Sequence, residues 1–156
     1  MGALLTIYLN DHLGGATAGV ELASRLRSSN QDDPEFGPAL AELCTEIEAD
    51  RETLKAVMNQ LGVAQGKLKP LVATLGERLG RLKLNGRLWS YSPLSRLDEL
   101  EFLQVAVVGK RGLWRALERT HAEDLSDFEL NALADRATQQ LRRLEALHLR
   151  AADLAL

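Results

Sequence analysis

The stretch that decides the fold is LAELCTEIEADRETLKAVMNQL, residues 40–61. Its apolar positions recur at alternating spacings of three and four residues, which places them on one face of an α-helix. This seam consists of Leu40, Leu43, Ile47, Asp50, Leu54, Val57 and Leu61. The pattern predicts a packed amphipathic helix over residues 35–61, with one aspartate standing inside its apolar face.

The same period continues outward into the first and last segments of the chain. The first segment carries a seam of Leu5, Leu9, His12, Ala16, Gly19, Ala23 and Leu26. The last segment carries Leu130, Leu133, Ala137, Leu141, Leu144, His148 and Ala151. Small residues are concentrated between positions 14 and 19 of the first segment, and they would let the backbone of a neighbouring helix approach closely.

Start and stop signals divide the chain into five helical segments. Starts are indicated by Asp33-Pro34, by Ser92-Pro93 and by a capping box of Ser126 with Glu129. Ends are indicated by Gly62 and Gly86. The predicted helices cover residues 3–29, 35–61, 70–85, 94–119 and 126–154.

These segments predict an all-α fold, an elongated four-helix bundle in one domain, 1–156. The short links at 30–34 and 120–125 make two antiparallel hairpins. The stretch 62–93, which contains the short additional helix, is long enough to cross the bundle between them. Only 4% of the residues are aromatic and 46% are hydrophobic, a composition that favours helices over strands.

Charge and cysteine usage narrow the class of protein. The formal net charge of −3 is too small to indicate a nucleic-acid or membrane partner. Cys44 is the only cysteine, which excludes an internal disulfide and fits a reducing compartment. The apolar start, residues 1–9, has no basic leader, and no apolar run approaches the roughly 20 residues that span a bilayer. We expect a cytoplasmic protein.

Four polar side chains fall on stripes that should face the core: His12, Asp50, Glu101 and His148. A buried charge requires a partner, because its desolvation costs several kcal/mol. Relative heights along an up, down, crossover, down, up arrangement predict two pairs, His12 with Asp50 and Glu101 with His148. In the simplest interpretation, each is a satisfied polar pair in the core.

A metal site is the second interpretation of the same residues. Histidines and acids on facing helices build carboxylate-bridged iron or manganese sites in helix bundles. Glu145 and His148 form an E-x-x-H motif whose side chains share one helix face. The candidate ligands are His12, Asp50, Glu101, Glu145 and His148.

The stretch EIEADRETLKAVMNQLG, residues 46–62, resembles the second helix of ferritin-like bundles, closest to their small bacterial stress-associated branch. The resemblance implies a four-helix bundle, often oligomeric, whose metal-binding members oxidise or store iron. Asp50 stands where the family has a histidine, and Ile47 stands where it has a glutamate three positions earlier. The resemblance therefore implies an altered or lost metal centre.

Basic residues crowd the predicted crossover, residues 67–87: Lys67, Lys69, Arg78, Arg81, Lys83 and Arg87. This segment is either a nucleic-acid or anion site, or a solvated face that pairs with the acidic segment 42–52. Trp114, close to Leu113 and Leu117, is predicted for the core or an interface.

No complete catalytic constellation is present in the sequence: Cys44 has no evident histidine partner, and no nucleophile elbow or phosphate loop occurs. The sequence therefore favours a non-enzymatic scaffold, interaction or regulatory protein that binds a second copy of itself or another protein. The alternative is a ferritin-like metal-binding protein that handles iron or manganese.

Overall fold

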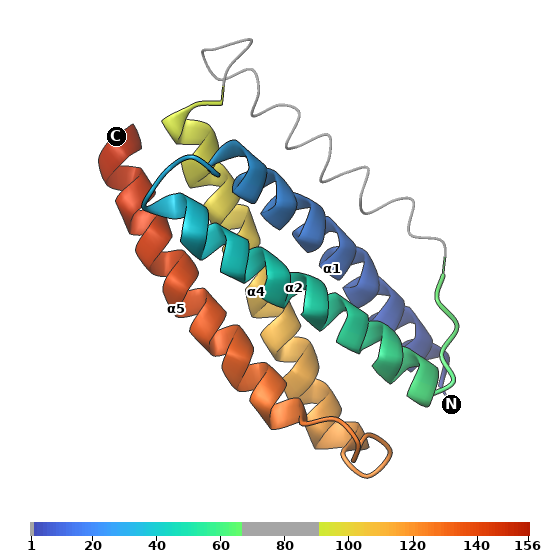
Figure 1. The fold of residues 1–156 in the computed structure, drawn as a ribbon. Helices are drawn as coiled ribbons and strands as arrows, with labels where there is room; N and C mark the ends of the chain where they lie inside the picture. Colours follow the sequence, from blue (N-terminus) through green and yellow to red (C-terminus); the bar gives the residue numbers. More distant parts are fainter. Residues whose placement is uncertain (1, 67–90) are drawn as a thin grey trace.

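The computed structural model describes residues 2–66 and 91–156, and these residues form four long α-helices (Figure 1). The helices are α1 (Ala3–Ser29), α2 (Phe36–Gln60), α4 (Pro93–His121) and α5 (Leu130–Ala155). The prediction of an all-α bundle with four long helices is confirmed. The expected helix 70–85, its cap Gly86 and the basic segment 67–87 lie outside the described residues.

The helices pack as two hairpins, α1 with α2 and α4 with α5, as the short links predict. The hairpins meet along two further seams, a close one between α1 and α4 and a looser one between α2 and α5. At the start of α4, Arg96 pairs with Asp33 (3.3 Å) and lies over the ring of Phe36. Because both partners belong to the α1–α2 end, α4 begins at the end of the bundle opposite to where α2 finishes (Figure 1).

Of the three predicted start signals, Ser92-Pro93 is confirmed, whereas Asp33-Pro34 marks the turn before α2, which begins at Phe36 with Glu35 at its N-cap. Asp33 Oδ1 accepts hydrogen bonds from the backbone N–H groups of Glu35 and Phe36 (2.9 and 3.1 Å), which holds the turn leading into α2. Ser92 caps α4 by accepting from the N–H of Ser95 (3.1 Å), with Pro93 as the first helical residue.

The capping box of Ser126 with Glu129 is wrong, because α5 begins only at Leu130 and Glu129 makes no side-chain cap. The link instead folds into turns that bury Leu125, whose N–H bonds to the carbonyl of His121 (3.0 Å). Burial of this leucine outweighs the gain of one cap hydrogen bond.

Gly62 ends α2 as predicted. Its φ of +63° is the left-handed conformation that glycine adopts without strain. The N–H of Val63 bonds to the carbonyl of Met58 (2.8 Å), and the N–H of Gly62 bonds to that of Asn59 (3.1 Å). These two bonds are the Schellman arrangement, which satisfies carbonyls that the helix end leaves free.

The core consists of two apolar clusters, one toward each end of the bundle. One includes Phe36, Leu40, Leu43, Leu100 and Leu144, while the other includes Leu9, Leu54, Met58, Trp114 and Leu117. The α2 seam is confirmed in full, since all seven of its residues, Asp50 included, are buried.

On α4 and α5 the buried face differs by one or two positions from the face that the sequence predicted to be buried. Glu101, expected in the core, is exposed, and the buried acid of α4 is Glu99. On α5 the buried positions are Gln140 and Leu147, rather than Leu141 and His148. No helix among the described residues is both long and apolar enough to cross a membrane.

Candidate functional site

A cavity of about 370 Å³ lies between α1 and α4, and residues of α2 form its floor. Small residues leave this space open, namely Gly15, Ala16 and Gly19 on α1 and Ala106 and Gly109 on α4. A Cβ atom added at Gly15 or Gly109 would meet no atom within 4 Å. The volume falls within the range of roughly 300–1,000 Å³ that small-molecule sites occupy.

Most of the lining is apolar, and the exposed side chains of Tyr8 and Val105 stand at its rim. Leu54, Leu103 and Leu113 cover the inner wall. A few polar groups face the same space from α1, α2 and α4. This combination of an apolar wall and a small number of polar groups is typical of ligand sites in helix bundles.

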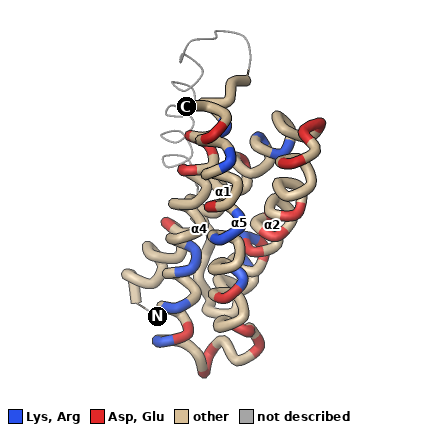
Figure 2. The backbone as a smooth tube through the Cα atoms, turned by 90° about the vertical axis from the view of Figure 1, so that its left-hand side faces the viewer, with Lys and Arg blue, Asp and Glu red and all other residues tan. Residues whose placement is uncertain are grey.

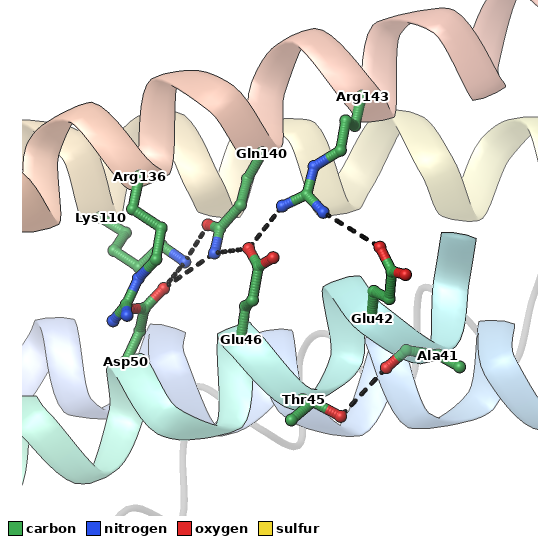
Figure 3. A network of polar contacts seen from close by, with 9 residues as sticks. All are labelled: Ala41, Glu42, Thr45, Glu46, Asp50, Lys110, Arg136, Gln140 and Arg143. Carbon is green, nitrogen blue, oxygen red and sulfur yellow. Dashed lines mark hydrogen bonds and ion pairs between the residues drawn. The ribbon is translucent and has the colours of Figure 1, made fainter. Parts of the chain in front are cut away.

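Asp50 carries the polar part of the floor, at the level that separates the two apolar clusters (Figure 3). Its side chain is 2% exposed. Oδ2 pairs with Lys110 Nζ (2.5 Å), and Oδ1 pairs with the guanidinium of Arg136. Cations from α4 and α5 therefore neutralise a carboxylate from α2, as a buried charge requires.

Gln140 joins this ion pair to a second carboxylate. Its Oε1 accepts from Lys110 (2.6 Å), while its Nε2 donates to Asp50 (3.1 Å) and to Glu46 (2.9 Å). Glu46 also accepts from Arg143 (2.5 Å), as Figure 3 shows. The amide is fully buried and uses both of its polar atoms, so it links the charges of α2, α4 and α5 into one network.

The network continues along the seam between α2 and α5 as a row of ion pairs. Arg143 also lies 3.8 Å from Glu42, and Arg150 bonds to Glu35 (3.0 Å). Figure 2 shows acidic positions along α2 beside basic positions on α5. The two helices are therefore joined mainly by charge where they do not pack closely.

Lys110 belongs to both the network and the cavity. Burial is the largest influence on this ammonium group and lowers its pKa below the usual value, although Asp50 acts in the opposite direction. Lys110 uses Asp50 and Gln140 as acceptors. Its charge is thus matched inside the protein before any ligand enters.

Trp114, in the inner wall, carries a polar N–H group that makes no hydrogen bond to the described residues. The side chain is completely buried, as its prediction for the core requires, and it lines the cavity. A buried donor without a partner costs about 1–3 kcal/mol, and Trp114 is too deeply buried for a molecule in the cavity to supply that partner.

His12 and Tyr8 form the α1 side of the cavity. Their rings meet edge to face with centroids 4.5 Å apart. Burial lowers the pKa of His12, with Asp11 opposing this shift, so the imidazole is neutral at pH 7. An uncharged histidine adds polarity to the wall without adding a cation.

The predicted pair of His12 with Asp50 is not formed, although both residues line the same cavity. Asp50 instead pairs with Lys110 and Arg136, because charged side chains neutralise a buried carboxylate better than a neutral imidazole does. The predicted contact of Glu101 with His148 is present at 2.9 Å, but it lies on the surface, where the Glu101 side chain is 56% exposed.

The five proposed metal ligands do not converge. Glu145 is exposed on α5, the helix that also carries His148. His12 and Asp50 line the cavity instead. No group of three or more histidine, cysteine or acidic side chains suited to a metal ion occurs among residues 2–66 and 91–156.

Sequence reasoning missed Lys110, Arg136, Gln140 and Arg143. One signal was available: Arg136, Arg143 and Arg150 recur every seven residues on α5, and acids recur at spacings of seven and four residues along one side of α2. In antiparallel helices such rows come into register and predict ion pairs between them.

A second buried carboxylate, Glu99, lies near the start of α4. It accepts a hydrogen bond from Tyr91 Oη (3.0 Å), and its Oε1 lies 2.6 Å from Arg25 Nε. Tyr91 in turn accepts from Asn30 Nδ2 (3.1 Å) at the end of α1. Burial raises the pKa of Glu99, and the nearby Asp98 adds to this, while Arg25 and Tyr91 oppose it. This cluster ties α4 to α1 and contains no cavity residue.

The chain matches no model of a protein family, no curated protein and no solved structure. The cavity and the charge network beside it are therefore the features of the molecule that bear on its function.

Proposed function

We propose that the protein is a non-enzymatic regulatory bundle that responds to a small, largely apolar ligand held between α1 and α4. The observation that carries this proposal is the cavity of about 370 Å³, whose wall is mostly apolar and is lined by residues of α1, α2 and α4. A ligand that fills such a space removes apolar surface from water, and its binding stabilises the folded state.

The chemistry of the wall supports binding rather than catalysis. Asp50 and Lys110 are the charged groups closest to an acid–base pair, and each is bound to the other. Asp50 is held further by Arg136, and Lys110 by Gln140. Asp50 and Lys110 are therefore paired with each other and do not offer a general base or nucleophile, which leaves the neutral imidazole of His12 as a lone proton acceptor without a second catalytic group paired to it.

Filling the cavity provides the test. In a Gly15→Leu variant the new side chain enters open space in the cavity, and the helix gains about 1 kcal/mol because leucine replaces glycine. We expect this variant to remain folded and to lose binding of tetralin, an apolar bicyclic probe, measured by calorimetry.

Gly112→Leu is the matched control, since Gly112 lies on α4, is exposed and does not line the cavity. It should gain similar helix stability and bind tetralin as the native protein does. Equal tetralin affinity in both variants, or no binding to the native protein, would remove the proposed function.

The ferritin-like alternative is a metal-binding protein of iron or manganese. Its support is the layout, with two antiparallel hairpins and α4 beginning at the end opposite to where α2 finishes, together with the contact of His148 with Glu101. At Asp50 a metal ion would have to displace both Lys110 and Arg136. The protein's own cations, Lys110 and Arg136, already neutralise Asp50.

Elemental analysis of protein purified without a histidine tag tests this alternative, with His148→Ala as the comparison. Stoichiometric iron or manganese that is lost in the variant would favour it over the ligand-binding proposal. Protein free of these metals, with no thermal shift on adding iron, manganese or zinc, would exclude it.

A further inference from the structure

The charged groups of the cavity indicate which class of ligand fits, an inference that rests on the proposed function. Four lining residues carry formal charge: Asp11, Asp50, Arg51 and Lys110. Asp50 and Lys110 bind each other (2.5 Å), and Arg51 pairs with Glu52 (3.0 Å), which lies outside the cavity. Three of the four charges are therefore already matched within the chain.

The floor around Asp50 is neutral as a whole. Its network joins three carboxylates to three cations: Asp50, Glu46 and Glu42 with Lys110, Arg136 and Arg143. An ionic ligand that reached the floor would lose its hydration and would have to displace one of these pairs. The inner end of the cavity therefore suits a hydrocarbon group, which its leucine wall contacts.

Asp11 is the exception among the four. It lines the cavity and is exposed, so its carboxylate lies at the opening, and it forms no ion pair with any residue of 2–66 or 91–156. The neighbouring imidazole of His12 is neutral and does not compensate this charge. Tyr8, at the same rim, adds an aromatic ring, and the face of such a ring attracts cations.

We propose that the ligand is a lipophilic amine, whose ring-sized hydrocarbon body occupies the cavity and whose single ammonium group binds the Asp11 carboxylate at the opening. The hydrocarbon fills the space left by Gly15, Ala16 and Gly109. The ammonium pairs with Asp11 while it stays in contact with water, so it avoids the desolvation of a fully buried ion. An acid of the same shape would meet Asp11 as a like charge, which opposes its binding.

The experiment compares three probes of one skeleton by calorimetry: aminotetralin with its amino group on the saturated ring, tetralin, and the tetralin carboxylate substituted at the same carbon. Each is titrated into the native protein and into an Asp11→Asn variant. We expect the ratio of aminotetralin to tetralin affinity to fall about five-fold in the variant, because one partly exposed charge-assisted hydrogen bond is lost. The hydrocarbon body contributes equally to both probes and cancels in the ratio. In the native protein the carboxylate should bind most weakly.

Glu21→Gln is the matched control, since Glu21 is the other acid of α1, is exposed and does not line the cavity. It removes the same charge from the same helix and should leave the affinity ratio unchanged. Both variants alter an exposed side chain, so the fold should be retained, which circular dichroism checks.

Ionic strength gives a second readout on the native protein. Salt shortens the Debye length from about 10 Å at 0.1 M to about 3 Å at 1 M. The ratio of aminotetralin to tetralin affinity should therefore fall as salt is added, and it should change less in Asp11→Asn.

Four results would overturn the inference while leaving the cavity as a site for apolar ligands. They are an affinity ratio that is the same in Asp11→Asn as in the native protein, an equal fall in Glu21→Gln, a ratio insensitive to salt, or tightest binding of the carboxylate. Aminotetralin binding that persists in Gly15→Leu would overturn it as well, because the amine would then lie outside the cavity. If tetralin does not bind the native protein, the proposed function itself fails.

Discussion

Removing the charge of Asp50 should destabilise the bundle through the partners that it leaves behind. In an Asp50→Asn variant, Lys110 remains 13% exposed and loses its only carboxylate contact within the network. Breaking a buried ion pair by removing one partner costs about 3–5 kcal/mol. We expect the lower end, about 3 kcal/mol, because asparagine keeps the shape and can still accept hydrogen bonds.

The size of this effect should depend on Lys110. Lys110→Met removes the buried ammonium, leaves Asp50 with Arg136, and should cost about 2 kcal/mol alone. In the double variant no unpaired ammonium remains, and methionine fills the space of the lysine stem. The double variant should therefore be more stable than the sum of the single changes predicts, by about 2 kcal/mol of coupling.

Urea unfolding at neutral pH, followed by circular dichroism, gives the four free energies of unfolding that this cycle needs. Arg136→Met is the control: its side chain is 36% exposed, so it can be lost from the network at smaller cost, about 1 kcal/mol. Additivity of the Asp50 and Lys110 changes within about 0.5 kcal/mol would refute the reasoning, because it would mean that the two groups do not interact.

Three further substitutions test the backbone and the second buried carboxylate. Gly37→Ala places a Cβ atom 2.8 Å from the backbone oxygen of Gln31, so it should lower the free energy of unfolding by about 1–3 kcal/mol, where an unobstructed helical glycine would gain stability. Gly62→Ala forces alanine into a φ of +63° and should cost about 1–2 kcal/mol in the same urea assay, whereas a neutral result would contradict the left-handed end of α2. Because burial raises the pKa of Glu99, the folded state binds its proton more tightly than the unfolded state, so this group makes the native protein less stable as pH rises above about 4.5. Glu99→Gln should remove that contribution, so its stability relative to the native protein should increase from pH 4.5 toward neutral, and a pH-independent difference would count against the raised pKa.

The sequence predicted α2 well because only one face of this helix is apolar. Its leucines, isoleucine and valine follow one stripe, and charged, polar or small residues occupy most of the remaining positions. On α5, by contrast, leucines occur at positions 141, 144, 147 and 149, which cover several faces. A stripe through Leu141 and His148 then fits as well as one through Gln140 and Leu147, and only packing against α4 decides between them.

The buried polar side chains were hard to predict for a related reason. A buried helix face is identified in a sequence from its apolar residues. The polar residues Glu99 and Gln140 therefore make the faces that contain them look exposed, although both side chains are buried. Asp50 was identified as a buried charge because the rest of its seam is unambiguous. Its partners were not, because Lys110 and Arg136 are 60 and 86 residues away in the chain.

The glycine-rich part of α1 had two possible consequences, and the structure contains both. At Gly19 the neighbouring helix does approach, since a Cβ atom there would lie 3.7 Å from Ala106 Cβ. One turn earlier, at Gly15, the space is not filled and becomes the cavity. A glycine on a helix face therefore predicts either a close helix contact or an empty space. Which of the two forms depends on the facing residues of α4, and the pattern of residues within α1 gives no information about them.

The position of the polar layer explains why the charge network and the cavity belong together. An apolar core that ran unbroken through the bundle would permit α2 to slide along α5 by a turn, because one leucine can replace another in such a seam. Such a shift would separate Asp50 from Lys110 and Gln140, leaving buried charges unpaired. The network thus fixes the register of α2 against α4 and α5, and Lys110 performs this role from the wall of the cavity. The proposed ligand between α1 and α4 would accordingly contact Lys110, one of the residues that link the two hairpins, so its binding should be coupled to how the hairpins pack.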